Sequence, residues 1–322
     1  MQGDPHLFAL LSAHARSAPF DRAEWLDLLA RHCGIEPTIA VASDGERRAV
    51  LALSGSGHLR SAANWYSFRT RPLLSEGGDG LLVALARDLK DRAWRVTLNP
   101  LPDEDGSASK LEQAFTAAGW VVARQQCDVN HVLAVGGRSY SEFLAGRPGQ
   151  LRTTLKRKAG KVRVVLLDRF DPAAWDAYEA IYAASWKPDE GSPGFLRAFA
   201  EAEGAAGRLR MAFAYAADRP VAAQFWTVEG GAAFIHKLAH VDDAKPLSPG
   251  TTLSAALFEQ VIDRDKVELV DFGTGNDGYK RDWMEQVRPR FRLDCLNPAT
   301  PRAWPHIARA MFHRLAHGAQ AD

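Results

Sequence analysis

Cysteine, long apolar runs and net charge are all scarce in this sequence, and each shortage excludes a class of protein. Three cysteines occur in 322 residues, Cys33, Cys127 and Cys295, and they lie far apart without the paired spacing of metal ligands. This odd, scattered set predicts neither a disulfide framework nor a zinc motif. The formal net charge is only +1, so the chain as a whole lacks the electrostatic footprint of a nucleic-acid-binding protein.

The chain also lacks signals for a membrane or for export. No uninterrupted apolar run approaches the length that a membrane-spanning helix needs. The first residues, Met-Gln-Gly-Asp-Pro-His, have neither the basic nor the apolar region of a secretory signal. We therefore expect a cytoplasmic protein in a reducing compartment.

The second half of the sequence predicts layers of helices and strands. Turn signals at Asp218-Arg219-Pro220 and at Gly230-Gly231 separate three extended runs, which predicts an antiparallel meander. Apolar spacing adds helices and further strands, so we expect an α+β fold with a mixed, mostly antiparallel sheet flanked by helices. The predicted helices are residues 173–186, a shorter one after Gly194, 251–264 and 279–286, and the predicted strands are 208–217, 220–229, 231–240, 267–272 and 289–296.

The first half repeats much the same order, which indicates a duplicated fold without visible sequence identity. We expect domains at residues 1–135 and 166–298, a linker helix at 136–165 and a C-terminal helix within 299–322. The predicted helices of the first half are residues 21–32, 80–89 and 107–118, and its predicted strands are 37–42, 49–54, 61–68, 94–98 and 120–127.

The predicted linker carries the strongest local charge of the chain. Two interpretations stay open: a solvated helix face between two domains, or a strip that faces the phosphates of a ligand or of RNA. Leu151 and Leu155, four residues apart, favour a helix with one docked side. The basic residues of this strip are Arg147, Arg152, Lys156, Arg157, Lys158, Lys161 and Arg163.

A glycine-rich bend at 269–283 is the first candidate site. A short apolar run delivers Asp271, Asp277, Tyr279 and Lys280 into this bend, where glycines allow backbone conformations closed to other residues. An ordinary turn capped by Asp277 is the alternative.

The loop before the predicted helix at 251–264 is the second candidate. Ser248 suits the N-cap and Pro249 the first helical position, so the helix start presents unpaired N–H groups and a positive dipole end. A phosphate or pyrophosphate is a natural ligand of such a start, and Lys245 can add a cation.

The strands of the meander carry further polar candidates. His236 and His240 share strand parity, which predicts one face for both and the other face for Lys237. No third ligand lies close in sequence, so we expect no metal, and His236 remains a candidate general base. Gln224 and Trp226 either face the same cleft or pack in the core.

Three motifs in this order resemble the GCN5-related N-acetyltransferase (GNAT) family. They are Lys237-Leu-Ala239, Ser248-Pro-Gly250 and Asp271-Phe-Gly-x-Gly-x-Asp-x-Tyr-Lys-x-x-Trp283, and Asn64-Trp-Tyr-Ser67 with Pro72-Leu-Leu74 resemble the family's first domain more loosely. The set is similar to a branch common in cellulose and exopolysaccharide biosynthesis loci. That branch is similar to the Fem-type peptidyltransferases, which also carry two GNAT-like domains.

The resemblance implies an acyl-CoA cosubstrate, acetyl-CoA or another, and no metal. It implies that Tyr279 donates a proton to the departing thiolate, and that Asp271 or Asp277 holds or deprotonates the acceptor amine. The pantetheine arm would lie along Leu238 and Ala239. The other implied contacts are Lys245, Ser248, Pro249, Gly250, Thr251 and Thr252 for the pyrophosphate, and Gln224, Trp226, Lys237 and Lys280 for the acceptor.

The expected function is therefore N-acylation of a small-molecule amine on a sugar, a nucleotide sugar or an amino acid. A Fem-type aminoacyl transferase that uses charged tRNA is one alternative, and a GNAT-like binding protein without activity is another. We expect a small-molecule amine as the partner rather than a nucleic acid.

Residues 304–315 have the pattern of a basic amphipathic helix, with Ile307, Ala308, Met311, Phe312 and Leu315 apolar. This helix either docks onto its own domain or lies on a membrane surface as a peripheral contact.

Overall fold

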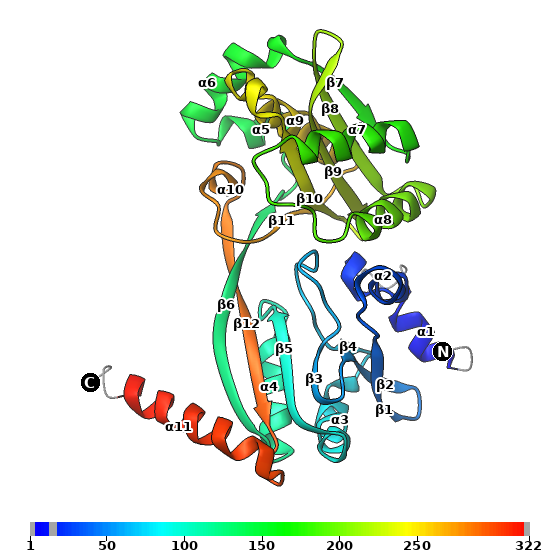
Figure 1. Ribbon diagram of the computed structural model, residues 1–322, viewed down its shortest axis with the longest axis vertical. Coiled ribbons are helices and arrows are strands. Elements are labelled where there is room, and N and C mark those ends of the chain that lie inside the picture. Colours follow the sequence, from blue (N-terminus) through cyan, green and yellow to red (C-terminus); the bar gives the residue numbers. More distant parts are fainter. Residues whose placement is uncertain (1–3, 13–17, 319–322) are drawn as a thin grey trace. The chain divides into compact units, whose positions relative to one another are not determined.

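The computed structural model describes residues 4–12 and 18–318, and its chain divides into two units (Figure 1). The first unit consists of residues 1–129 and 288–322, and the second is the continuous stretch 130–287. The chain enters the second unit along strand β6 (Val121–Ala134) and leaves it along strand β12 (Gln286–Leu296). The predicted second domain ended at residue 298, whereas β12 belongs mostly to the first unit.

The first unit is a mixed sheet covered by helices. Its strand order is β1-β2-β3-β5-β12-β6, with β4 paired to β2, and only β3 and β5 run parallel among the pairs for which a register is given. Leu85, Leu111 and Phe115 from its helices pack with Val96 and Leu98 of β5 in one buried core. Its helices are α1 (Pro5–Leu10), η2 (Pro19–Asp21), α2 (Ala23–Cys33), η3 (Gly78–Gly80), α3 (Leu81–Asp88), η4 (Leu89–Asp91), α4 (Ser107–Ala117), η8 (Pro301–Ala303) and α11 (Trp304–Gly318), and its further strands are β1 (Thr38–Asp44), β2 (Arg47–Ser54), β3 (Gly57–Ser61), β4 (Leu73–Leu74) and β5 (Ala93–Leu101).

The strand predicted at residues 61–68 is wrong, because β3 ends at Ser61. The chain turns directly after it: Asn64 Oδ1 accepts the amide of Tyr66 at 3.0 Å, and the Asn64 carbonyl accepts the amide of Ser67 at 3.1 Å. An asparagine that bonds its own backbone in this way favours a turn over a strand.

The second unit is also a mixed sheet between helices, so the predicted α+β arrangement is confirmed. Its strand order is β6-β11-β10-β9-β8-β7, and β10 and β11 are its parallel pair. Its helices are α5 (Tyr140–Ala145), α6 (Gly149–Lys158), η5 (Ala159–Lys161), α7 (Pro172–Ala183), α8 (Pro193–Ala205), η6 (Asp242–Leu247), α9 (Pro249–Glu259), η7 (Gln260–Arg264) and α10 (Gly278–Trp283), and its further strands are β7 (Arg163–Leu167), β8 (Leu209–Ala216), β9 (Arg219–Glu229), β10 (Ala232–His240) and β11 (Leu269–Thr274).

The stretch predicted as a linker helix, residues 136–165, forms two short helices and the start of an edge strand of this unit. Pro148 breaks the predicted single helix, because proline cannot continue the hydrogen-bond ladder of a helix interior. Strand β7 therefore precedes α7, where the sequence pattern predicted two helices ahead of the first strand.

Helices cover opposite faces of the second sheet. Phe225 of β9 packs on Trp175 of α7, with ring centroids 5.3 Å apart, while its neighbour Trp226 packs on Phe258 of α9 at 5.0 Å. Consecutive strand residues point to opposite faces, so α7 and α9 lie on different sides of the sheet.

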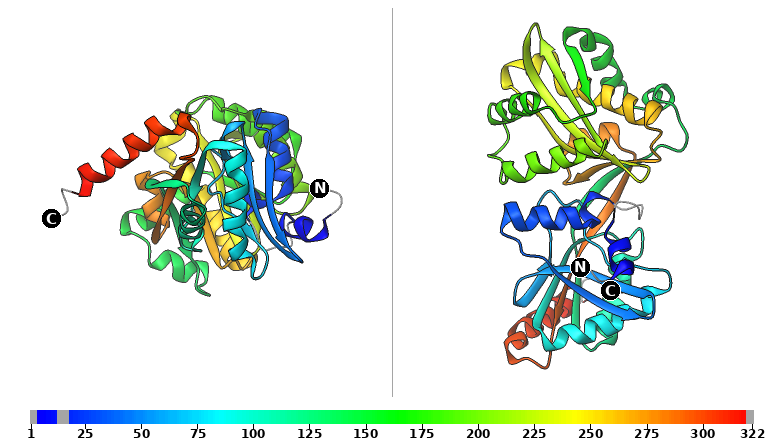
Figure 2. Two further views of the ribbon diagram at one scale, coloured as in Figure 1. Left: turned by 90° about the horizontal axis from the view of Figure 1, so that it is seen from below. Right: turned by 90° about the vertical axis from the view of Figure 1, so that its right-hand side faces the viewer.

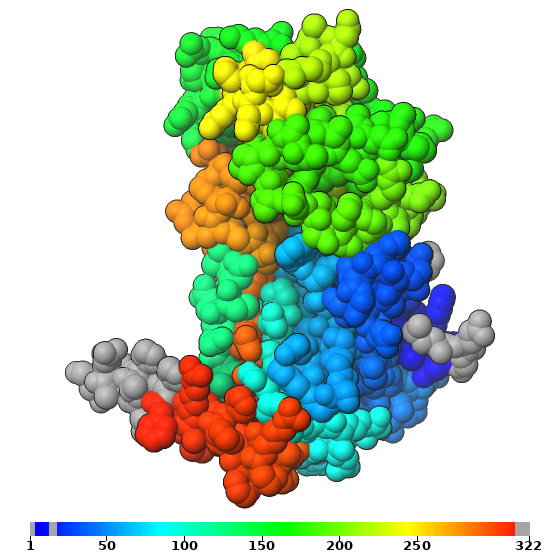
Figure 3. Space-filling model, viewed as in Figure 1, coloured from blue at the N-terminus to red at the C-terminus, as the bar shows by residue number. Residues whose placement is uncertain are grey.

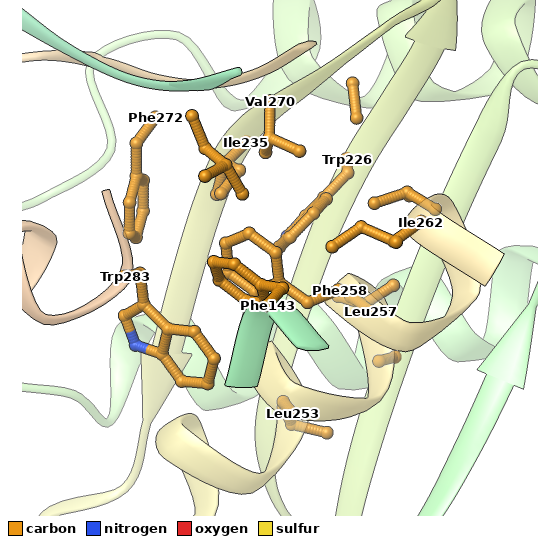
Figure 4. Close-up of a cluster of buried hydrophobic side chains, with 14 of the residues drawn as sticks. Phe143, Trp226, Ile235, Leu253, Leu257, Phe258, Ile262, Val270, Phe272 and Trp283 are labelled. Atoms are coloured by element: carbon orange, nitrogen blue, oxygen red, sulfur yellow. The ribbon is translucent and has the colours of Figure 1, made fainter. Parts of the chain in front are cut away.

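An aromatic stack holds the α9 face together (Figure 4). Phe258 lies between Phe143 of α5, at 5.1 Å, and Trp283 of α10, at 4.8 Å, and all three side chains are buried. This stack ties α10 to the core although α10 has only six residues.

We predict that Phe258→Ala lowers the free energy of unfolding by about 3–5 kcal/mol, because it leaves a cavity among three other aromatic rings. Urea denaturation measures the change. Phe312→Ala is the matched control: Phe312 is exposed, and its loss changes stability by no more than about 0.5 kcal/mol. Equal effects of the two substitutions would contradict the role of the stack.

Candidate functional site

Strand β10 carries a β-bulge and loses its parallel partner at nearly the same place. Its pairing with β9 shifts between Ile235 and Lys237, which leaves His236 as the extra residue. Its pairing with β11 covers only residues 232–234. From the bulge onward, one edge of β10 therefore faces away from β11 and is open to a ligand.

The bulge also changes which face each side chain occupies. The His236 ring packs on Phe225 at 5.3 Å and on Phe199 at 5.0 Å, and Lys237 Nζ lies 5.3 Å from the Tyr182 ring. His236 and Lys237 thus share the α7–α8 face. The predicted strand parity, with His236 beside His240 and opposite Lys237, is wrong because it assumed a regular strand.

The first cavity, of about 300 Å³, lies between β10 and the start of α9. Ser248 has a left-handed backbone (φ 52°, ψ 47°) that turns the chain into α9. Gly250 brings the helix against β10, since a Cβ atom at this position would lie 3.3 Å from Leu238 Cδ1. The cavity is lined by Leu151, Trp186, Lys187, Leu238, His240, Lys245, Ser248, Pro249, Gly250, Thr251, Ser254, Tyr279, Asp282 and Trp283.

The start of α9 has features that can hold an anion. The Thr252 amide bonds the Ser248 carbonyl at 3.3 Å, so the amides of Gly250 and Thr251, which precede it, have no acceptor inside the helix. Ser248 occupies the predicted N-cap position, but its Oγ caps no amide and accepts instead from Lys158 Nζ at 3.2 Å. Lys158 therefore joins Lys245 beside the positive end of the helix dipole.

Most of the residues predicted to contact the pyrophosphate and the pantetheine arm line this cavity, and two do not. Leu238, Lys245, Ser248, Pro249, Gly250 and Thr251 are in its wall, whereas Ala239 and Thr252 are buried behind it. Lys158 was seen only as part of a basic strip, because its partner Ser248 lies 90 residues further along the chain.

Tyr279 of α10 forms part of the opposite wall of the first cavity. Its ring contacts Phe272 edge-on at 5.5 Å, and about half of the side chain is exposed. Burial, with a smaller contribution from the Asp277 charge, raises the pKa of Tyr279 to about 12. The hydroxyl therefore stays protonated at neutral pH and can donate a hydrogen bond to a group in the cavity.

The other polar residues of the glycine-rich bend hold its backbone. Asp271 Oδ1 accepts the Gly273 amide at 2.8 Å and Asn130 Nδ2 at 3.0 Å. Lys280 is buried and its Nζ donates to the Thr274 carbonyl at 2.5 Å. Asp277 is largely exposed, 3.9 Å from Lys280. None of these three side chains lines the first cavity. Asp271 and Lys280 shape the bend that carries Tyr279, whereas Asp277 stands at the N-cap of α10 without a capping hydrogen bond.

An ion-pair network fixes the far end of α10. Arg147 is buried, donates to the Trp283 carbonyl at 3.3 Å and pairs with Glu285. Arg138 also donates to Glu285, at 2.8 Å, and this bond lowers the pKa of the Glu285 carboxyl. Arg147, one of the residues of the basic strip, is thus occupied inside the fold.

His236 and His240 have different surroundings. His236 Nε2 lies 2.8 Å from Thr227 Oγ1, and His236 lines neither of the two cavities described here. His240 lines the first cavity and stacks on Trp186 at 4.3 Å. Its Nδ1 lies 3.0 Å from the Val241 carbonyl, which can only accept, so Nδ1 carries the proton and Nε2 is the acceptor of the neutral ring.

The two strand residues predicted to face the cleft lie beneath it. Gln224 is buried and its Oε1 accepts from Ser254 Oγ at 3.2 Å, so it orients a residue of the first cavity. Trp226 is part of the buried aromatic core shown in Figure 4.

A second cavity, of about 290 Å³, lies over α7 and the segment that follows it. Sequence patterns missed it, because Trp175, Tyr178 and Tyr182 have the helical spacing of ordinary core residues. Lys187 lines both cavities. The second is lined by Trp175, Tyr178, Glu179, Tyr182, Ala183, Lys187, Pro188, Asp189, Glu190, Pro193 and Leu196.

The charges around Lys187 alter its protonation. Burial, followed by the positive charge of Lys237, lowers the pKa of Lys187 to about 8, although Glu190 and Asp277 oppose the change. Lys237 itself pairs with Glu190 at 2.9 Å. Burial and the Glu190 charge raise the pKa of Tyr182 to about 12. Lys187 therefore changes its protonation state near pH 8.

The residues that the structure describes contain neither a cluster of metal ligands nor a membrane-spanning helix. No group of three His, Cys, Asp or Glu side chains among them could hold a metal ion. Within the same residues, none of the helices is both long and apolar enough to cross a membrane.

Most of the second unit matches a known family. Residues 149–281 match the family model of the acetyltransferase (GNAT) domain. No curated protein matches the sequence.

Three solved structures share the fold of nearly the whole chain at low sequence identity. FemX is 10% identical, with a TM-score of 0.65, over 90% of this chain and 95% of that one. The C-terminal domain of a putative lysylphosphatidylglycerol synthetase from Agrobacterium fabrum is 12% identical, with a TM-score of 0.60, over 95% and 92%. A tandem GNAT protein from the clavulanic acid biosynthesis pathway is 15% identical, with a TM-score of 0.51, over 91% and 94%. The predicted tandem GNAT-like fold is confirmed.

We predict that Lys237→Met raises the pKa of Lys187 from about 8 toward its ordinary value of 10.5. The substitution removes a positive neighbour and releases Glu190 from its pair, and both changes favour the charged form of Lys187. The measurement is an NMR titration of ¹³C-dimethylated lysines, with Lys187→Arg to assign the resonance. A resonance that titrates at the same pH with and without Lys237 would refute the coupling.

Proposed function

We propose that this chain, whose residues 149–281 match the acetyltransferase (GNAT) domain, transfers an acyl group from acyl-CoA to an amine by direct attack on the thioester. The first cavity is the observation that carries the proposal. It combines an anion-binding helix start with a strand edge that has lost its partner, and these suit the two ends of a CoA molecule.

We assign the CoA pyrophosphate to the amides of Gly250 and Thr251, with Lys158 and Lys245 beside it. A phosphate at a helix start gains from both the free N–H groups and the dipole. The amides of the pantetheine arm would pair with the open edge of β10 along Leu238, as an added strand pairs with a sheet edge.

The chemistry assigned to the site is attack of a neutral amine on the thioester carbonyl. A C–N bond forms, the carbonyl oxygen becomes an oxyanion, and a backbone N–H near Leu238 stabilises it. The C–S bond then breaks, and Tyr279 donates its proton to the CoA thiolate. Tyr279 suits this role because its hydroxyl is protonated and lies in the cavity wall.

The amine must lose a proton before or during the attack. Lys187 is the group we assign to accept it, since Lys187 borders both cavities and has a pKa of about 8. The second cavity would hold the acceptor, with Asp189 and Glu190 near its ammonium group and aromatic rings beneath its carbon skeleton. An amine on a sugar, a nucleotide sugar or an amino acid fits this chemistry, and an acceptor in exopolysaccharide synthesis belongs to that class.

The second candidate is aminoacyl transfer from charged tRNA. The similarity to FemX and to a putative lysylphosphatidylglycerol synthetase favours it, and Lys156, Arg157 and Lys161 form an exposed basic surface. Against it, the longest helix among the described residues has 15 residues, too short for the long paired-helix insertion that some Fem proteins use for tRNA. Salt-dependent binding of charged tRNA, without binding of CoA, would favour this candidate over the first.

We predict that Lys158→Met weakens CoA binding roughly ten-fold, because one charged contact is worth about 1.5–3 kcal/mol. Isothermal titration calorimetry with CoA measures the change. Lys156→Met removes an exposed lysine of the same helix and should leave the affinity unchanged. A loss of affinity shared by both variants would indicate general electrostatic attraction rather than the assigned site.

We predict that Tyr279→Phe lowers kcat about 10²-fold or more while the affinity for acetyl-CoA stays the same, because only the proton donor is lost. Release of the CoA thiol from acetyl-CoA in the presence of a panel of amines measures kcat. Full activity of Tyr279→Phe would remove Tyr279 from the mechanism. An unmodified chain that binds CoA but releases no thiol with any amine would point to a binding protein.

A further inference from the structure

Helix α11 exposes an apolar stripe that most helices bury. Trp304, Ile307, Ala308, Met311 and Phe312 follow one another at the spacing of a single helix face. Yet the exposed fractions are 58% for Trp304, 53% for Met311 and 73% for Phe312. In Figures 1 and 2 the helix extends from the strands of its own unit, and on the face shown in Figure 3 no other described residues of that unit lie over it.

The first turn of α11 and the η8 turn before it pack against the first unit, so the start of the helix that carries the stripe is anchored. Arg302 lies over the Trp94 ring of β5, 4.9 Å from its centroid, and the His306 ring lies 5.3 Å from it. Trp304 Nε1 donates to the Pro298 carbonyl at 2.9 Å, and Ala303 is buried. The fold thus anchors one end of α11 and presents the rest.

The charge around this stripe is of one sign. From residue 295 to residue 321 the sequence contains no Asp or Glu, while Arg302, Arg309 and Arg314 are basic. Two copies packed through this helix would bring arginines together without acidic partners, which is unfavourable. A surface of anionic phosphates offers the opposite charge to the arginines and an apolar layer to the stripe.

We propose that α11 binds an anionic phospholipid surface, with Met311 and Phe312 among the acyl chains and Arg309 at the phosphates. The proposal concerns the first unit alone and is independent of the acyl-transfer chemistry. Binding of this kind falls as salt rises and is absent from neutral lipid, because the arginines are attracted only by anionic headgroups.

The test is sedimentation of the full chain with vesicles of phosphatidylglycerol and phosphatidylcholine, and with vesicles of phosphatidylcholine alone. We expect the unmodified chain to bind the anionic vesicles and to bind the neutral ones at least ten-fold more weakly. The double variant Met311→Glu/Phe312→Glu should lose at least ten-fold in binding to the anionic vesicles. Phe8→Glu, which changes an exposed aromatic residue of α1, should bind like the unmodified chain.

Three results would overturn the proposal. They are failure of the unmodified chain to bind anionic vesicles, equal binding to neutral vesicles, and undiminished binding by the double variant. Sedimentation equilibrium without lipid tests the alternative, in which a second copy of the chain covers the stripe. A dimer that dissociates in the Phe312→Glu variant would show that this alternative is correct. Circular dichroism of each variant confirms that the fold is unchanged, which is expected because both residues are exposed.

Discussion

The β-bulge at His236 is the constraint on which the candidate site depends. One extra residue in β10 puts His236 and Lys237 on the α7–α8 face, while Leu238 keeps its contact with the start of α9. The parallel pairing with β11 also ends just before this point, so the bulged strand has a free edge. The bulge and the end of this pairing therefore leave β10 with a free edge beside the first cavity.

Helix α10 is too short to be stable alone, and the structure holds it from three directions. Lys280 bonds the carbonyl of the bend before it, Phe258 stacks on Trp283 at its last residue, and Arg147 bonds the carbonyl of that tryptophan. These contacts fix the position of Tyr279. The conspicuous polar residues of the bend thus act mainly on the backbone, and the less conspicuous tyrosine faces the cavity.

Local patterns predicted the layers, the meander and the helix start at Ser248–Pro249, because each depends on residues close together in the chain. The prediction of a strand at 61–68 was wrong because turn formation at Asn64 outweighed apolar alternation. The predicted face of His236 was wrong because a β-bulge leaves no pattern in a single sequence. Lys158 and Lys187 were missed for another reason: their roles come from packing against distant segments, such as Ser248 and the edge of β10. Most of the fold was therefore predictable, whereas the contact of Lys158 with Ser248 and the whole second cavity were not.

If the second cavity holds the acceptor as proposed, Lys187, which lines both cavities, would couple acceptor binding to proton exchange. A cationic acceptor entering the second cavity brings one more positive charge near a lysine that is already half-neutral at about pH 8. The ammonium of the acceptor and the proton on Lys187 therefore compete, so acceptor binding expels protons and its affinity rises with pH. Selectivity among amines would then depend on how easily each one displaces that proton, as well as on its shape.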